Sequence, residues 1–243
     1  MYALLNLLLF CVFNNCCYYV YPYFLSLNPN YNRLKDEKKL YVLKNVIKSV
    51  NLLLLITQTN DLISCIIFNK HLSNNFVNNF ASFYVSNDIV ALYRVKKLPS
   101  STLFHHIMTT ILLFVSYNID FENLEDTSLA KLLIVYTCFS CYPFTVNSYL
   151  GLRFLEYKEE KINKDSELKP LKLNHQYFNI FLEFLRQSSY WIYMICIICN
   201  WSYQIYDLFI NPFTLGRLIY IMCMFPIVND DIVLLTWLKK KHK

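Results

Sequence analysis

Long apolar runs separated by short polar connections form the dominant pattern of this chain. A helix needs about 20 apolar residues to cross the hydrocarbon core of a bilayer, and seven segments approach that length. They cover residues 3–27, 42–68, 80–94, 103–117, 128–150, 185–206 and 213–238. The third and fourth are short and carry polar residues, so hydropathy supports them least. The pattern predicts an all-α, multi-pass membrane bundle of about seven transmembrane helices.

Composition agrees with a membrane protein. Of the 243 residues, 56% are hydrophobic and only 16% are charged, and there are 2 glycines. A soluble domain of this length carries more charge and more glycine. The net charge of +6 comes from lysines and arginines between the apolar runs, which indicates topology rather than a nucleic-acid partner.

The charged connections predict an orientation. Segments 33–39 (with Lys44 and Lys48), 94–97 and 239–243 are basic, whereas segment 120–126 is acidic. Basic loops stay cytosolic, so seven spans place the N-terminus in the lumen and the C-terminus in the cytosol. The chain then divides into an N-terminal helix with its cytosolic loop (1–38), a membrane domain (39–238) and a basic tail (239–243). The long connection 151–184 is predicted to be a cytosolic linker that ends in an interfacial helix at 177–185.

The 9 cysteines all lie in apolar segments, where thiols behave as small hydrophobic groups. Two C-x-x-C spacings occur, Cys138 to Cys141 and Cys196 to Cys199. Zinc and redox sites need a solvated or tetrahedral setting that apolar helices rarely supply. We therefore expect buried packing, with no disulfide framework and no metal site.

The most informative polar residues are His105 and His106, which open the fourth apolar run. Ionisable residues at membrane depth are costly and indicate a functional site. Asp88 lies in the preceding span, and the short turn 95–101 makes the two helices antiparallel neighbours. A carboxylate that accepts from a ring N–H fixes the tautomer of the imidazole and raises its basicity. Because consecutive helical residues point about 100° apart, we expect only one histidine to face the cavity and the other to brace a neighbouring helix.

Further polar residues lie in the later spans. Asn147 is in the fifth, and Asn229, Asp230 and Asp231 are in the seventh. The two aspartates lie about two turns from the basic tail, so at least one of them should face the interior of the bundle.

These residues resemble the TLC-domain family, which includes ceramide synthases, translocation-associated membrane proteins and lipid-regulating relatives. Its signature is a His pair, a Thr three residues on, then Leu and Ser-Tyr, matched here by His105, His106, Thr109, Leu112, Ser116 and Tyr117. Weaker likenesses are Asp88 before the pair, segment 142–147 followed by Arg153, and Asn229 with Trp237. Together they extend from about residue 39 to the C-terminus.

The resemblance implies six helices, the second to the seventh, around a central lipid or acyl-chain cavity, with the first helix outside. It implies catalytic roles for His105, His106 and Asp88. The resemblance, together with the depth of the polar residues in the predicted bundle, implies that a further set binds lipid or substrate: Thr109, Ser116, Asn147, Arg153, Asn229 and Asp231. No cofactor is expected, although acyl-CoA would be the co-substrate of a synthase. One departure is that segment 132–144 lacks the acidic motif of ceramide synthases, which favours the branch that tunes phospholipid composition over the N-acylation of sphingolipid precursors.

Three functions fit these residues. The first is an acyl-CoA-dependent acyltransferase, with Arg94, Lys96 and Lys97 near the nucleotide phosphates or simply marking the cytosolic side. The second is a non-catalytic lipid-binding protein, and the third is a trafficking or cargo receptor of the endoplasmic reticulum. Lys240 and Lys241 match the di-lysine signal by which coat proteins return membrane proteins to that compartment, although a basic tail also satisfies the topology alone.

Overall fold

A computed structural model of the chain describes residues 2–123, 128–156 and 169–240. These residues form helices joined by short connections and contain no strand, so the all-α prediction is confirmed. The elements in order are α1 (Tyr2–Leu25), α2 (Pro29–Asn32), α3 (Asp36–Ile56), α4 (Thr59–Phe68), α5 (Asn74–Arg94), α6 (Ser100–Ser116), α7 (Ser128–Cys141), α8 (Phe144–Leu152), the 3-10 turn η2 (Arg153–Leu155), α9 (Lys169–Ile210) and α10 (Leu215–Lys239).

Two helices, α1 and α10, are by themselves long and apolar enough to cross a membrane. Two bent pairs reach the same length together: α3 with α4, at 55°, and α7 with the segment from Phe144 to Leu155, at 41°. The described residues therefore contain two candidate spans, or four if each bent pair is one span. Helix α6 is apolar but has only 17 residues, and α5 carries asparagines, serines and Asp88 along its length.

The two breaks have local chemical causes and lie together. Pro143 separates α7 from α8 because proline has no N–H to continue the helical ladder. At the other break, the Thr59 hydroxyl donates to the carbonyl of Ile56 at 2.8 Å, a side-chain bond that competes with the helical ladder. The same hydroxyl lies 3.1 Å from the hydroxyl of Tyr142, so the two bends are linked by a hydrogen bond.

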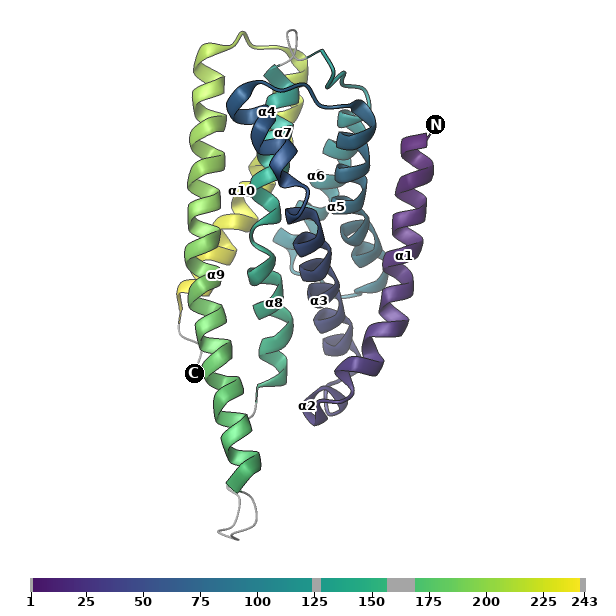
Figure 1. Cartoon of the computed structure of the whole chain (residues 1–243), viewed down its shortest axis with the longest axis vertical. Helices are drawn as coiled ribbons and strands as arrows, with labels where there is room; N and C mark the ends of the chain where they lie inside the picture. Colours follow the sequence, from purple (N-terminus) through teal and green to yellow (C-terminus); the bar gives the residue numbers. More distant parts are fainter. Residues whose placement is uncertain (1, 124–127, 157–168, 241–243) are drawn as a thin grey trace.

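The helices form a closed ring. Helix α3 packs on α5, α5 on α6, α6 on α10, α10 on α9, α9 on α8, and α8 returns to α3. Helix α1 lies outside this ring against α5 and α3, along one edge of the bundle in Figure 1. The space inside the ring holds the site described below.

A small residue lets two walls of the ring approach closely. A Cβ added at Gly151 of α8 would lie 2.9 Å from Val46 Cγ2 and 3.3 Å from the carbonyl oxygen of Val42, both on α3. Small residues at helix contacts allow this kind of backbone approach in membranes. The contact fixes the end of α8, and with it Arg153, beside the start of α3.

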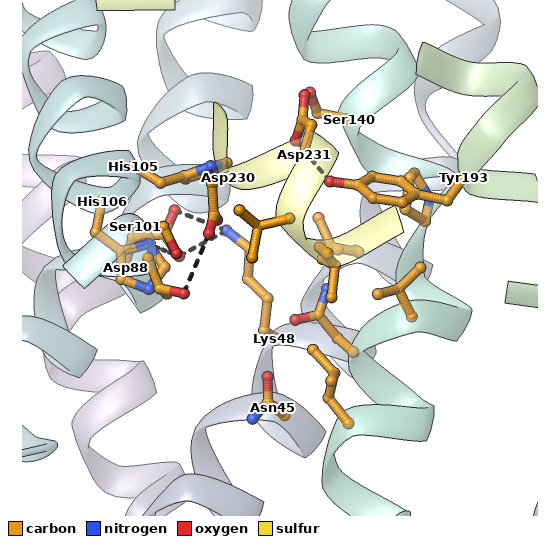
Figure 2. A pocket seen from close by; sticks show the side chains of 18 of the residues that line it. Asn45, Lys48, Asp88, Ser101, His105, His106, Ser140, Tyr193, Asp230 and Asp231 are labelled. Atoms are coloured by element: carbon orange, nitrogen blue, oxygen red, sulfur yellow. Dashed lines mark hydrogen bonds and ion pairs between the residues drawn. The ribbon is translucent and has the colours of Figure 1, made fainter. Parts of the chain in front are cut away.

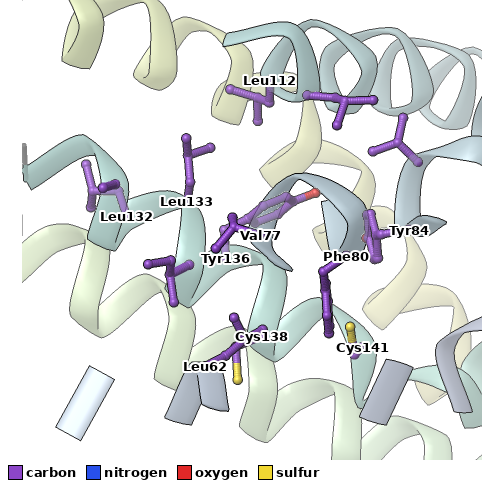
Figure 3. Close-up of a cluster of buried hydrophobic side chains, with 14 of the residues drawn as sticks. Leu62, Val77, Phe80, Tyr84, Leu112, Leu132, Leu133, Tyr136, Cys138 and Cys141 are labelled. Atoms are coloured by element: carbon purple, nitrogen blue, oxygen red, sulfur yellow. The ribbon is translucent and has the colours of Figure 1, made fainter. Parts of the chain in front are cut away.

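Apolar side chains fill the end of the ring formed by α4, α7 and the facing parts of α5, α6 and α10. Figure 3 shows this cluster, which includes Leu62, Val77, Phe80, Leu112, Leu132 and Leu133. The segment after α6 closes the same end: Phe121 is fully buried, and its backbone N–H donates to the side chain of Asn74 at 2.6 Å. The open, polar part of the ring therefore lies toward the other end.

Helix α9 differs from the sequence prediction. The predicted interfacial helix at 177–185 is not separate, because α9 runs unbroken for 42 residues from Lys169. At 1.5 Å per residue it spans roughly 60 Å, about twice the hydrocarbon thickness. Figure 1 shows it projecting past the other helices. After Pro170 the segment has no proline or glycine before Pro212, so nothing in it interrupts the helix.

Helix α1 is held to the ring by buried polar contacts. Asn14 is fully buried, donates to the Ser86 hydroxyl of α5 at 2.8 Å and accepts from Asn51 of α3 at 2.6 Å. Arg94 donates to Asn15 at 2.6 Å and to the Tyr19 hydroxyl at 2.6 Å.

We expect Asn14→Ala to destabilise the protein by about 1–3 kcal/mol, because Asn51 and Ser86 would lose their buried partner. Thermal unfolding in detergent measures the change, and Asn60→Ala, at an exposed position, is the matched control. Equal melting temperatures for the two variants would contradict an anchoring role for Asn14.

Candidate functional site

A central cavity of about 300 Å³ lies inside the ring. Side chains from α3, α5, α6, α7, α8, α9 and α10 line it, so every wall of the ring contributes. Its lining combines apolar residues with an unusual density of charged ones (Figure 2). Charged groups inside an apolar bundle are retained where they bind or react with something.

One face of α3 contributes several of the polar residues that line the cavity. Tyr41, Lys44, Asn45, Lys48 and Leu52 follow the three- and four-residue spacing of one helical face, and all five line the cavity. Both lysines are buried. Counting Lys44 and Lys48 among the charges of a cytosolic loop is therefore wrong, because both lie within α3 and line the cavity.

His106 and Lys48 share the carboxylate of Asp88. His106 Nδ1 lies 3.3 Å from Asp88 Oδ1, and Lys48 Nζ lies 3.0 Å from each carboxylate oxygen. Lys48 also donates to the backbone carbonyl of Tyr84 at 2.8 Å and lies 3.9 Å from the centre of the Tyr84 ring. Asp88 and His106 lie side by side, as expected for neighbouring antiparallel helices, and the lysine is an addition to the pair.

His105 has a separate carboxylate partner. Its Nδ1 lies 3.3 Å from Asp230 Oδ2 of α10, and Asp230 also accepts from the Thr102 hydroxyl at 3.4 Å. The two imidazole rings are 5.7 Å apart and nearly perpendicular, at 85°. Both histidines line the cavity, so the expectation that only one would face it is wrong. The 100° step between them directs one toward α5 and the other toward α10, and the cavity spans that arc.

Asp231 follows Asp230 on α10 but contacts a different neighbouring helix. It accepts a hydrogen bond from the Tyr193 hydroxyl of α9 at 2.5 Å, and Figure 2 shows this pair across the cavity from the histidines. Both aspartates line the cavity, as expected of at least one of them.

The geometry suits acid–base chemistry. A carboxylate beside Nδ1 of a histidine holds the ring with Nε2 as the free basic nitrogen. Here two such pairs open from one helix into one cavity. The Nδ1 atoms of both histidines lie 3.3 Å from their carboxylates but form no hydrogen bond in the described residues, and the Nε2 atom of His106 is likewise buried without a partner.

The other predicted site residues fall into three groups. Asn147 and Arg153 line the central cavity. Thr109 and Ser116 line a smaller, mostly apolar cavity of about 30 Å³, and their hydroxyls donate to carbonyls of their own helix at 3.0 and 2.7 Å. Asn229 is exposed on the outer face of α10, so the expected role for it in the cavity is wrong.

The predicted phosphate contacts and the tail lie elsewhere. Arg94 binds α1, and Lys97 pairs with Glu37 at 2.9 Å, and neither lines the cavity. Lys240 is exposed at the end of α10, and Lys241 lies outside the described residues.

The cysteines form no disulfide: all nine lie in the described ranges as free thiols. Cys138, Cys141 and Cys196 are buried, in agreement with the packing role, whereas Cys199 is exposed. In the described part of the chain, no group of three or more histidine, cysteine or acidic side chains is placed to hold a metal ion.

A third cavity lies beside the central one. It measures about 240 Å³ and is lined almost entirely by apolar residues of α9 and α10, with Leu132 of α7. Gln204 lines this cavity and donates to Asn200, which lines the central cavity, at 3.1 Å. The two cavities are therefore lined by residues one helical turn apart on α9.

Comparison with models of protein families, with curated proteins and with solved structures finds no match to this chain. The resemblance to the TLC-domain family therefore rests on the residues quoted above.

Proposed function

We propose that this chain is a multi-pass membrane protein of lipid metabolism whose central cavity takes the polar part of a lipid. The observation that carries the proposal is a charged cavity enclosed by a bundle whose outer surface is apolar. Large apolar side chains are exposed along α1, α9 and α10. Such a surface suits contact with lipid, and a lipid reaching the cavity brings a polar group to the histidines.

The finer assignments belong to the same proposal. The ring has six walls if each bent pair counts as one wall, and α1 lies outside it. This arrangement supports a TLC-like core. On that basis we assign seven spans, an endoplasmic-reticulum membrane, a lumenal N-terminus and a cytosolic C-terminus. Binding of coat proteins to the tail through Lys240 and Lys241 completes the assignment.

The neighbouring apolar cavity supports a lipid substrate. A lipid has a polar head and an acyl chain, and the charged central cavity and the apolar cavity, one helical turn apart along α9, suit each of them. Apolar walls with a few convergent polar groups are the usual composition of such sites.

Acyl transfer from acyl-CoA is the second candidate, and the two histidine–aspartate pairs favour it. One imidazole would take the proton from the amine or hydroxyl of the acceptor lipid. The nitrogen or oxygen of that acceptor group forms a bond to the thioester carbonyl carbon at the same time. The carbon–sulfur bond then breaks, and the thiolate leaves with the proton returned by the imidazolium. The acidic motif missing from α7 is no obstacle here, because Asp88, Asp230 and Asp231 bring carboxylates to the cavity from α5 and α10.

Labelled acyl-CoA supplied to purified protein tests this reaction, with lipid incorporation as the readout. We expect His105→Ala or His106→Ala to lower incorporation by at least about 100-fold, the usual contribution of a general base. His71→Ala, at an exposed histidine outside the cavity, is the matched control and should leave incorporation unchanged.

The lipid composition of cells that lack the protein separates the two candidates. A selective ceramide deficit would favour N-acylation, whereas altered phospholipids would favour the phospholipid-tuning branch. Unaltered lipids in those cells, with no lipid retained by the purified protein, would contradict the proposed function as a whole.

A further inference from the structure

Two cations at one end of the central cavity have no carboxylate partner among the residues that the structure describes. Among the described residues, the other buried cationic side chains, Lys48, Arg186 and Arg217, each form an ion pair with an aspartate or glutamate. Lys44 is only 4% exposed, and it forms no such pair with a described residue. Arg153 forms none either, and its Nε is buried without a hydrogen-bond partner.

Aromatic rings hold these two cations near each other. Lys44 Nζ lies 5.6 Å from the centre of the Tyr41 ring, and Arg153 Cζ lies 6.0 Å from the centre of the same ring. Arg153 also stacks on Trp237, at 4.2 Å. Stacking orients a guanidinium while leaving its N–H edge free to donate to an acceptor with two oxygens.

The local arrangement of charges at this end of the cavity favours a bound anion, although the lining as a whole holds three carboxylates, Asp88, Asp230 and Asp231. Lys44 lies one helical turn from Lys48, and like charges at this spacing repel each other. The direct partners of Asp88 are Lys48 and His106, and Asp230 lies beside His105, so neither carboxylate forms an ion pair with Lys44. Burying an unpaired cation is costly, and an anionic ligand removes that cost.

The depth of the two cations suggests the kind of anion. Tyr41 is in the second turn of α3, Arg153 directly follows α8, and Trp237 is in the last turn of α10. Tyrosine and tryptophan gather at the level of lipid headgroups. Phosphate is the common anion there, and its tetrahedral oxygens can reach donors on different helices, unlike those of a planar carboxylate.

We propose that Lys44 and Arg153 bind a phosphate group of the ligand at the mouth of the central cavity, with Tyr41 and Trp237 as its aromatic walls. The inference deepens the proposed function and rests on it, because it names the chemical class of the ligand. Tyr41 and Lys48 are seven residues apart on α3, which corresponds to about 10 Å along the helix. The phosphate beside Tyr41 would lie at about this distance from Lys48 and the histidine–aspartate pairs.

Pairs of ligands that differ in their phosphate groups measure the contribution of phosphate to binding. One pair tests a lipid as the source of the phosphate, and the other tests a soluble molecule. For a lipid source, purified protein in a phosphate-free detergent is given phosphatidic acid or a diacylglycerol with the same acyl chains, and bound lipid is counted by native mass spectrometry. For a soluble source, binding of coenzyme A is compared with binding of pantetheine. We expect the wild-type chain to prefer the phosphate-bearing member of one pair.

Lys44→Met and Arg153→Gln should each weaken binding of that member by about 10- to 100-fold while leaving binding of its phosphate-free partner unchanged. Lys44→Arg keeps the charge and should retain the preference, and Lys96→Gln, outside the cavity, is the control. Melting temperatures within a few degrees of wild type show that the variants are folded.

A wild-type chain with no preference within either pair, or a preference that survives both substitutions, would overturn the phosphate site. Because the histidine variants are assayed separately, this result would leave the proposed lipid function standing. Failure to bind any of the four molecules would contradict both.

Discussion

Replacing Asp207 with alanine is expected to lower the free energy of unfolding by about 3–5 kcal/mol, because it leaves a buried guanidinium without a counter-ion. Arg217 is 1% exposed and pairs with Asp207. It also donates to the carbonyls of Asn211 at 2.7 Å and Pro212 at 3.0 Å. One side chain therefore fixes the turn between α9 and α10.

Unfolding in mixed detergent micelles, followed by tryptophan fluorescence, measures this loss. The double variant Asp207→Leu with Arg217→Met should recover much of the stability, because no charge is then left unpaired. Asp61 and Lys70 form an exposed pair at 3.2 Å, so Asp61→Ala is the matched control, with an expected effect below about 1 kcal/mol. A loss for Asp207→Ala no larger than for Asp61→Ala would contradict the assigned role of the buried pair.

Asp88→Asn is the second substitution with a large expected effect. It removes the counter-ion of Lys48 and the carboxylate beside His106, and breaking a buried ion pair on one side costs about 3–5 kcal/mol. We expect a lower unfolding midpoint together with loss of the lipid chemistry assigned to the cavity. Thermal unfolding and acyl-CoA incorporation by the same preparation measure the two effects.

A double variant separates the two roles of Asp88. Lys48→Met with Asp88→Asn leaves no unpaired lysine, so most of the stability should return. His106 would still lack its carboxylate, and incorporation should stay at least about 10- to 100-fold below wild type, as for other groups that orient a reactive histidine. Recovery of full incorporation in this double variant would show that Asp88 serves stability alone.

The apolar pattern was sufficient to predict the helices because long hydrophobic runs have few alternatives in a membrane. Each predicted segment coincides with a helix or with a bent pair of helices. The error in α9 has a physical reason: the mixed charges at 156–165 followed by Pro170 suggested a linker up to residue 176, yet Pro170 is the second residue of α9, and proline is tolerated in the first turn of a helix.

Local contacts in the site were predictable and distant ones were not. Asp88 and His106 lie on helices joined by a short turn, so their pairing follows from antiparallel packing. The pairing of His105 with Asp230 joins residues on the fourth and last apolar runs, and no spacing shows which helix will lie beside α6. Lys48 was missed because its charge was assigned to a loop, although its four-residue spacing from Lys44 placed both on one helical face.

The order of helices around the ring has a consequence for biosynthesis. In space α10 lies between α6 and α9, although it follows both along the chain. Until the ribosome has delivered α10, the ring has an open side, and His105 has no Asp230. The nascent bundle therefore gains its second histidine–aspartate pair and its last wall in one late step. A chain stopped before Leu215 would leave the charged interior open on the side that α10 covers in the complete ring.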